Sequence, residues 1–501
     1  MDQLQETIHC LTDNEVKEFR LDLQKTARSK EIVQLFDAYH SPQEYKNGEL
    51  GKKIYGSSGE SKFHAARRRL FEQLNHFLLD RYNEGEDEIE SQINQAIAFA
   101  GIMIRRRNFA VAAERLNSAH EMAEHISSYE LLDIIYRYQL SHPSELVDDV
   151  PALCARAEQN RKHHNLLSEL NIAFARIKNT MKILRAEGRN FDPETTIREE
   201  LRKLQYNKRK LLCNPVFMRR LLELVRTVVA SGKDYSKFKP YVHKAYNLLL
   251  KANAFTGYNA SLECEFLYMI SHVHYRTREF DVAKTYLEKL KAKIGGPEER
   301  HHHLYARAMT LNAGILFYSN QLNPSIELLQ HQIDLKGSRA TRIEKLNMRL
   351  NLAVYLFFAR DFKTANRILL QLPLKTNALE SEYGKEWFFK RDLIDVIFQY
   401  ELGHLDISAS RLKAIQTNYA EVLQEPIYQR AEVFIQLITH FFNHPEEVRT
   451  EAFLKRVVSA GIKWEGQSED IQAILFFCWL RGKMQGRESY EVVLERVMEE
   501  V

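Results

Sequence analysis

One short pattern recurs between Ser271 and Leu412 and constrains the fold more than any other feature of the chain. A large apolar residue is followed by a small residue three positions later and by a leucine seven positions later. Successive copies begin 42, 40 and 43 residues apart. The copies are Phe280, Ala283 and Leu287; Leu322, Ser325 and Leu329; Phe362, Ala365 and Leu369; and Leu405, Ser408 and Leu412. Because positions i, i+3 and i+7 share one face of an α-helix, each copy predicts the start of a helix with a notch for a neighbouring backbone.

The residues before each copy predict a preceding helix that pairs with it. A small or β-branched residue lies nine positions upstream, and an aromatic residue lies five positions upstream. These residues are Ser271 and Tyr275, Ala313 and Phe317, Ala353 and Phe357, and Val396 and Tyr400. A helix pair repeated about every 40–43 residues is the signature of an α-solenoid, in which each pair buries its apolar face against its neighbours.

A further copy of the pattern extends the prediction toward the N-terminus. Phe109 lies 171 residues before Phe280, about four steps of the same period, so the register is compatible with one continuous superhelix. We therefore predict an α-solenoid over 89–501, with its clearest repeats over 258–420 and capping helices over 468–501. Only 19 glycines and 11 prolines occur in 501 residues, which favours long helices with short turns and an all-α fold.

The helix pairs resemble the tetratricopeptide-repeat family. In that family a small residue and aromatic residues on the first helix precede an aromatic residue at the turn, an alanine and a large residue. Ala353, Phe357, Phe362, Ala365 and Leu369 match this order. The period here exceeds the family's 34 residues, and the tryptophan-leucine-glycine part of its first helix is mostly missing. The resemblance implies a right-handed α-solenoid of tetratricopeptide-like repeats, whose first helices line a concave face.

Residues 1–83 predict a separate helical unit at the N-terminus. This segment resembles the N-terminal part of uncharacterised bacterial tetratricopeptide-like proteins, which implies a shared architecture and no particular activity. Its last helix contains Arg67, Arg68 and Arg69, and short helices that end in a basic one can form a DNA-binding module. Three consecutive residues fan around a helix, so only part of the cluster could meet one surface. Our alternative prediction is thus a ligand- or peptide-responsive transcriptional regulator.

Charge, cysteine content and motifs exclude several classes of function. The formal charge of +4 gives the whole chain no broad preference for nucleic acid or anionic lipid. Five scattered cysteines predict reduced thiols rather than disulfides or a zinc site. The N-terminus has no signal-peptide pattern and no apolar run approaches a membrane span, so we predict a soluble, cytoplasmic protein. We find no catalytic or phosphate-binding motif and predict neither enzymatic activity nor a cofactor.

Residues 301–303 are three consecutive histidines, and histidine is a common metal ligand. Adjacent helical residues point about 100° apart and cannot all reach one ion. We therefore predict a helix start rich in solvent-facing histidine, and no metal site.

The remaining candidate site is a surface. Positions 15, 8 and 4 residues upstream of each copy correspond to the groove positions of tetratricopeptide repeats. Carried over, the resemblance implies these partner-binding residues: Glu265, His272, Arg276, Arg307, Tyr318, Asn347 and Lys390. Arginine, lysine, tyrosine and asparagine on one face would suit a peptide carboxylate or an acidic segment. Our leading hypothesis is a non-enzymatic scaffold that binds a protein or peptide partner on the concave face.

Overall fold

The computed structural model describes most of the chain. Described are residues 3–9, 11, 13–26, 30–40, 47–56, 60–84, 89–186, 195, 199–200, 202–203, 212–231, 235–256, 259–295, 303–335, 340–375, 379–380, 383–424, 428–460 and 471–498. This part of the chain is helical and contains no strand, so the all-α prediction is confirmed. The chain divides into two compact units, Met1–Asn160 and Arg161–Val501.

The first unit contains two hydrophobic clusters. Its helices are α1 (Gln3–His9), α2 (Asp13–Thr26), α3 (Lys30–His40), α4 (Asn47–Tyr55), α5 (Glu60–Glu84), α6 (Ile89–Arg105), α7 (Phe109–His125), α8 (Tyr129–Ser141), α9 (Pro143–Leu146) and the beginning of α10 (Val150–Ala186). One cluster joins α1 to α5 around Phe19 and Phe36. The other joins α6 to α10 around Leu116 and Ile135. The predicted division between an N-terminal unit, 1–83, and a solenoid stays a prediction.

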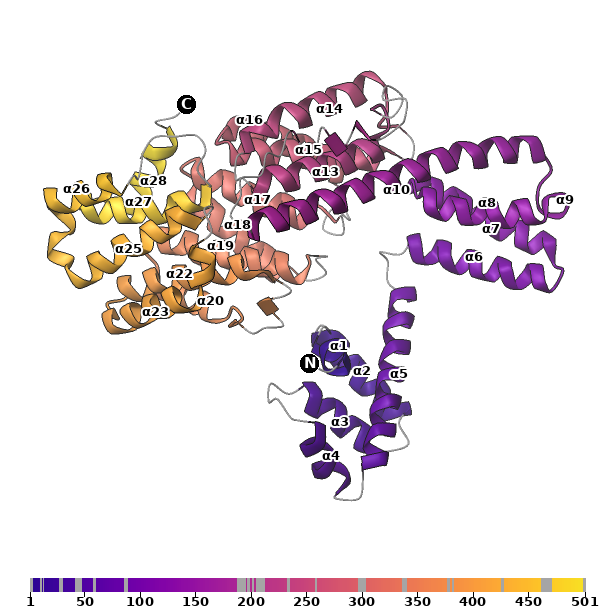
Figure 1. Ribbon diagram of the computed structural model, residues 1–501, viewed down its shortest axis with the longest axis horizontal. Coiled ribbons are helices and arrows are strands. Elements are labelled where there is room, and N and C mark those ends of the chain that lie inside the picture. Colours follow the sequence, from indigo (N-terminus) through magenta and orange to yellow (C-terminus); the bar gives the residue numbers. More distant parts are fainter. Residues whose placement is uncertain are drawn as a thin grey trace. The chain divides into compact units, whose positions relative to one another are not determined.

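The second unit is a series of consecutive helix pairs (Figure 1). After the end of α10 its helices are α13 (Pro215–Ser231), η1 (Tyr235–Lys237), α14 (Lys239–Lys251), α15 (Ala260–Arg276), α16 (Phe280–Ile294), α17 (Tyr305–Tyr318), α18 (Leu322–Asp334), α19 (Arg342–Phe358), α20 (Phe362–Leu370), α22 (Lys385–Glu401), α23 (Leu405–Asn418), α24 (Ala420–Leu423), α25 (Gln429–Asn443), η5 (Pro445–Arg449), α26 (Glu451–Ser459), α27 (Ile471–Gln485) and α28 (Ser489–Met498). Within each pair the two helices pack on each other, and successive pairs pack in chain order.

Each copy of the sequence pattern begins a helix, as predicted. Phe109, Phe280, Leu322, Phe362 and Leu405 are the first residues of α7, α16, α18, α20 and α23. The small or β-branched positions nine residues before and three residues after each of them have no exposed surface at all. These positions are Ala100, Ala112, Ser271, Ala283, Ala313, Ser325, Ala353, Ala365, Val396 and Ser408. The notch in each stripe is therefore fully buried.

The turns inside the pairs share one backbone conformation. The residue two positions before each large apolar residue is left-handed, with a φ of 58° to 79°. These residues are Arg107, Arg278, Asn320, Arg360 and Gly403. At α15 the N–H of the following residue, Glu279, donates to the carbonyl of His274 at 2.9 Å, which is the hydrogen bond of a Schellman motif. One repeated helix ending thus sets the same entry into the second helix of each pair.

The C-terminal pair, α27 and α28, packs back onto earlier helices. Tyr490 Oη donates to the carbonyl of Phe317 in α17 at 2.7 Å, across 173 residues of sequence. Trp479 is 1% exposed, and Val493 of α28 is fully buried. The helices predicted within 468–501 to cap the array therefore also cover part of α17, α19 and α22.

The cysteines that the structure describes are free thiols. Cys264 and Cys478 are buried, and Cys154 and Cys213 are exposed, while Cys10 lies outside the described residues. Within the described ranges, no helix is long and apolar enough to cross a membrane.

Candidate functional site

The first helices of successive pairs lie side by side and form one face of the second unit. We call the face made by α13, α15, α17, α19 and α22 the first-helix face. Side chains link neighbouring helices along it. Arg307 Nε in α17 donates to Glu344 Oε1 in α19 at 2.5 Å, and Trp387 Nε1 in α22 donates to Asn347 Oδ1 in α19 at 3.0 Å. Two of the predicted binding residues, Arg307 and Asn347, therefore already join adjacent helices.

The part of this face over α13, α15 and α17 is rich in charge. We call it the polar stretch, and it contains Arg219, Arg226, Glu265, Tyr268, His272, Arg276 and Arg307. Glu265 Oε1 lies 2.8 Å from His303 Nε2 and 3.9 Å from Arg219 Nη1. Arg276 Cζ lies 4.5 Å from the ring centre of Tyr235, a cation–π distance. The structure thus brings four of the predicted binding residues together here.

His272 is a neutral group in the middle of the polar stretch. Its ring lies 6.0 Å from that of Tyr235 and is stacked 5.9 Å from that of Tyr268. Burial and the nearby charges of Arg276 and Arg226 lower the pKa of His272 to about 3. Burial also raises the pKa of Tyr268. The arginines consequently supply the positive charge of this surface, beside aromatic rings that are uncharged near neutral pH.

The carboxylate of Glu265 balances part of that charge. Burial works to raise the pKa of Glu265, but the hydrogen bond from His303 and the charges of His303, Arg219 and Arg307 outweigh it and lower the value. Glu265 and Glu344 supply carboxylates to Arg219 and Arg307.

A small apolar pocket opens further along the same face, between α17, α19, α22 and α27. Its volume is about 90 Å³. Its lining includes Tyr275, Tyr318, Asn351, Val354, Lys390, Ile394 and Trp479. Two of the predicted binding residues, Tyr318 and Lys390, therefore belong to this pocket. Because α27 forms one wall, the chain's own C-terminal pair covers part of the face that we expected to be open, and Tyr318 is only 4% exposed.

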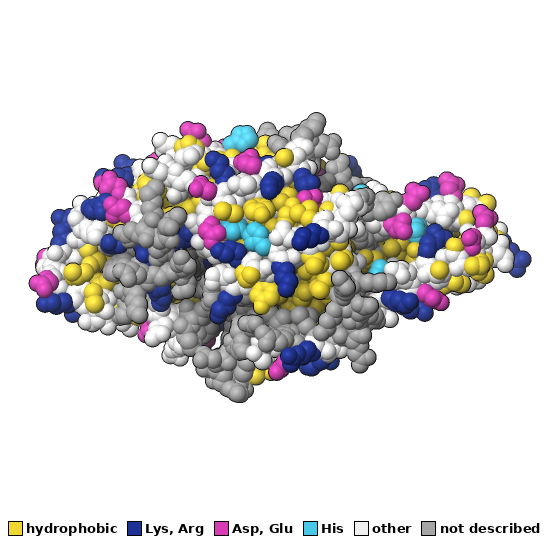
Figure 2. Space-filling model, turned by 90° about the horizontal axis from the view of Figure 1, so that it is seen from above, with side chains coloured by type: hydrophobic (Ala, Val, Ile, Leu, Met, Phe, Trp, Pro, Cys, Tyr) yellow, Lys and Arg dark blue, Asp and Glu magenta, His cyan; other side chains and the backbone are white. Residues whose placement is uncertain are grey.

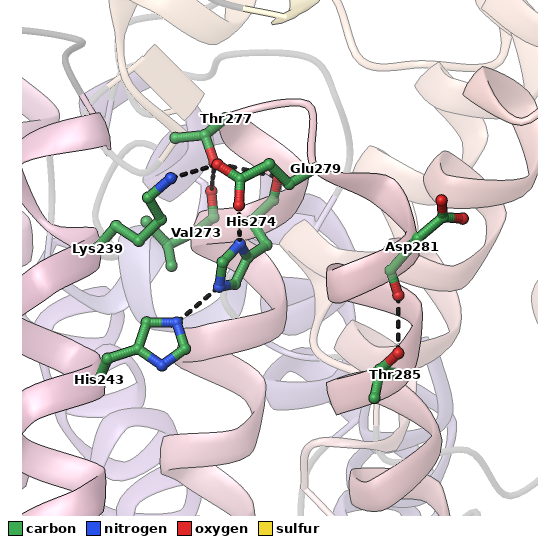
Figure 3. A network of polar contacts seen from close by, with 8 residues as sticks. All are labelled: Lys239, His243, Val273, His274, Thr277, Glu279, Asp281 and Thr285. Carbon is green, nitrogen blue, oxygen red and sulfur yellow. Dashed lines mark hydrogen bonds and ion pairs between the residues drawn. The ribbon is translucent and has the colours of Figure 1, made fainter. Parts of the chain in front are cut away.

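A separate polar network links α14 to the turn between α15 and α16 (Figure 3). His243 Nε2 lies 2.6 Å from His274 Nε2, and His274 Nδ1 lies 2.7 Å from Glu279 Oε2. Lys239 Nζ donates to the other oxygen of Glu279. We call His243, His274 and Glu279 the histidine relay. His274 is buried, whereas His243 is half-buried. Figure 2 shows the surface over α14 and α16, where histidine and hydrophobic side chains lie among lysines and arginines.

Hydrogen-bond chemistry fixes the tautomers in the relay. Burial works to raise the pKa of Glu279, but the hydrogen bonds from Lys239 and His274 outweigh it and lower the value, so this carboxylate only accepts. His274 Nδ1 must then donate, and neutral His274 accepts at Nε2 a proton that His243 Nε2 carries. The relay can hold and pass a proton. Since both ring nitrogens of His274 are bound, one to α14 and one to the turn before α16, we interpret the relay as a junction between helix pairs.

Lowering the pH should destabilise the second unit through these histidines. Burial lowers the pKa of His243, of His274 and of His272. The unfolded chain, with histidine pKa values near about 6.5, then binds more protons than the folded chain. The free energy of unfolding should therefore fall as the pH drops below about 6.5, by at most about 1.4 kcal/mol per pH unit for each neutral histidine. Urea unfolding between pH 8 and pH 5.5 measures this. His243→Gln should flatten the dependence, and His331→Gln, an exposed control on α18, should not.

The basic cluster of the first unit lies on α5. Arg68 and Arg69 are exposed and Arg67 is half-buried. Arg68 Nε donates to Glu72 Oε1 at 2.9 Å. Arg67 and Arg68 also line a hollow of about 470 Å³ together with His64. Part of the cluster's charge is therefore balanced within its own helix.

Within the described residues, one group of three side chains has ligand atoms close enough together to share a metal ion. Of the histidines at 301–303, 301 and 302 lie outside those residues, and His303 is bound to Glu265. The ligand atoms of His444, Glu446 and Glu447 lie within 4.8 Å of one another at the surface. Glu447 Oε2 already lies 2.8 Å from His440 Nε2. His444 and Glu446 are exposed, and Glu447 is half-buried.

The fold and the face define an all-helical protein of consecutively packed helix pairs. A scan against models of known protein families and a search of curated proteins found no match to this chain. The assignment of a binding role therefore depends on the contacts and charges of the first-helix face.

Proposed function

We propose that the protein is a non-enzymatic scaffold, a tetratricopeptide-like α-solenoid that binds an acidic segment of a protein or peptide partner on its first-helix face. The observation that supports this most is the gathering of Arg226, Arg276 and Arg307 around Tyr268 and His272, across three neighbouring helices. Guanidinium groups bind carboxylates through paired hydrogen bonds, and aromatic rings beside them add apolar contact. The repeated turn and the nearly constant spacing of the pairs, 40–43 residues, support the solenoid.

A short labelled peptide of glutamates provides the test, because it carries negative charge and has no large apolar side chain. Full-length protein should bind it, measured by fluorescence polarisation, and binding should weaken as the salt concentration rises. Replacing Arg276 and Arg307 together by glutamine should weaken binding about tenfold or more, since each charge-assisted hydrogen bond contributes about 1.5–3 kcal/mol.

The matched control removes one arginine from a different helix face. Arg367 is exposed on α20, a second helix, and Arg367→Gln should leave the affinity unchanged. Equal weakening by Arg367→Gln would mean that the peptide binds by overall charge alone, which would contradict a site on the first-helix face.

The alternative function, a transcriptional regulator that binds DNA through α5, has less support. Arg67 is half-buried and Arg68 is paired with Glu72, so few free charges remain for phosphates. Steeply salt-dependent binding of duplex DNA by the full chain, lost in a variant with Arg68 and Arg69 replaced by glutamine, would favour this alternative.

A further inference from the structure

Two histidines lie one helical turn apart at the C-terminal end of α25, and two glutamates follow them. His440 belongs to the last turn of α25 and His444 is its C-cap, while Glu446 and Glu447 lie in the first turn of η5. Residues four positions apart are neighbours on a helix surface, and the ring centres of His440 and His444 are 5.0 Å apart. Imidazole and carboxylate groups both bind metal ions, so this short segment gathers four candidate ligands.

The ligand atoms of three of these residues converge. Those of His444, Glu446 and Glu447 lie within 4.8 Å of one another, and His444 Nδ1 is 3.6 Å from Glu446 Oε1. Because zinc binds nitrogen and oxygen at about 2.0–2.2 Å, two of its tetrahedral ligands are about 3.3 Å apart. Small rotations of these side chains are therefore sufficient to bring all three onto one ion. Three protein ligands leave the fourth position for water.

The backbone already holds this segment in a compact turn. The N–H of His444 donates to the carbonyl of His440 at 2.9 Å, and the N–H of Glu447 donates to the carbonyl of His444 at 3.1 Å. Pro445, between His444 and Glu446, has a φ that its ring fixes. An ion that binds here has only side chains to order, which lowers the entropic cost of binding.

His440 orients one of the three ligands. Its Nε2 lies 2.8 Å from Glu447 Oε2, and because an ionised carboxylate only accepts, Nε2 is the donor. The ring of His440 is stacked 5.9 Å from that of the buried Phe453, which fixes its position. Carboxylates that bind metal ions commonly accept such a hydrogen bond from a neighbour. The charge of Arg456 also acts on Glu447 and opposes a cation, but it is outweighed by the two carboxylates.

We infer that His444, Glu446 and Glu447 bind a divalent transition-metal ion of the zinc type, with His440 positioning Glu447. A set of one imidazole and two carboxylates fits zinc better than magnesium or calcium, which prefer oxygen ligands alone. The ion joins the end of α25 to η5 and thereby stabilises the connection to α26. None of these residues belongs to the first-helix face as defined above, so the inference is independent of the proposed function.

Zinc chloride added to the metal-free full chain provides the test, with isothermal titration calorimetry as the measurement. The exposed Cys154 and Cys213, together with Cys10, are replaced by serine in every protein compared, so that thiolates do not bind the probe. His444→Gln and Glu447→Gln should each weaken zinc binding at least about tenfold, since loss of even an outer partner of a ligand costs about 10–100-fold. Magnesium chloride should not displace the zinc.

The role of His440 is tested by two variants. His440→Phe keeps a ring against Phe453 and removes the donor, so it should weaken zinc binding about tenfold. His440→Gln keeps an N–H donor and should restore most of the affinity. The matched controls are Glu327→Gln and His331→Gln, an exposed glutamate and histidine that also lie one turn apart, on α18. Neither should change the affinity.

A second measurement is the melting temperature. Zinc should raise it in the parent chain, because an ion bound to the folded state stabilises that state, and His444→Gln should remove the rise. Melting without zinc shows whether each variant folds, and Glu446→Gln repeats the test if His444→Gln does not. Equal zinc affinity in the parent chain and in these two variants, or equal weakening by His331→Gln, would mean that zinc binds scattered surface histidines and would overturn the inference.

Discussion

Replacing Trp479 by alanine is expected to lower the free energy of unfolding of the second unit by about 3–5 kcal/mol, the range for large aromatic residues in cores. Trp479 is 1% exposed and lies 5.9 Å from the ring of Tyr400 and 6.1 Å from that of Phe441. Its Nε1 also donates to Glu401 Oε1 at 2.6 Å. The substitution leaves a cavity and removes a donor from a carboxylate that is half-buried. Urea unfolding followed by circular dichroism measures the loss.

Two variants make this measurement specific. Trp479→Phe retains the ring contacts and loses the hydrogen bond, so it should cost about 1–2 kcal/mol. Leu454→Ala removes a side chain that is 46% exposed on α26 and should cost little. A loss below about 1 kcal/mol for Trp479→Ala would mean that α27 is not packed as described.

Gly314→Ala should destabilise the protein, although alanine normally stabilises the interior of a helix by about 1 kcal/mol relative to glycine. Gly314 lies within α17 and is buried, and an added Cβ would lie 2.7 Å from Tyr275 Oη and 2.9 Å from two atoms of its ring. Such overpacking typically costs about 1–3 kcal/mol. The free energy of unfolding of the variant, compared with that of the unaltered chain, gives the sign directly.

A double-mutant cycle tests the cause. Tyr275→Leu removes the ring that the new methyl group meets, so Gly314→Ala should be less harmful in that background. A stabilising effect of Gly314→Ala in the unaltered chain would show that α15 and α17 are further apart than the structure places them.

Local spacing predicted the helix pairs well, because the pattern and the structure that it produces lie within the same turns of helix. Phe280, Ala283 and Leu287 are seven residues apart at most, so the stripe and its notch can be recognised without any knowledge of distant contacts. The turns were harder to foresee. Arg278 and Arg360 adopt the left-handed conformation where glycine is usual, so the helix ends carry little compositional signal.

Contacts between distant segments could not be predicted from spacing. Tyr490 and Phe317 are 173 residues apart. The local sequence pattern around either residue does not predict a contact with the other. The same limit applies to the candidate site. The groove positions carried over from the tetratricopeptide resemblance located Lys390 and Tyr318, but not the wall that Trp479 contributes to their pocket. The apolar residues on both sides of Trp479, from Ile471 to Leu480, are a local sign of burial and do not identify what this segment packs against.

The histidine relay was missed for a related reason. His243 lies in a region where the repeated pattern is eroded, since Tyr241 and Ala245 occupy the positions of the small residue and the leucine after Phe238. His274 is buried with partners on both ring nitrogens. Its partner, 31 residues earlier, becomes a neighbour only when α14 packs on α15.

The return of α28 to α17 also affects the order in which the chain can fold during synthesis. An open array of helix pairs can assemble progressively as each pair leaves the ribosome. Here the hydrogen bond between Phe317 and Tyr490 cannot form until Tyr490 has been synthesised. Tyr490 lies 173 residues later in the chain and is added roughly 10–35 s later at typical rates of translation. During that interval we expect the aromatic side chains of α17, α19 and α22 that α27 and α28 later cover to be exposed to solvent, where they favour aggregation of the nascent chain.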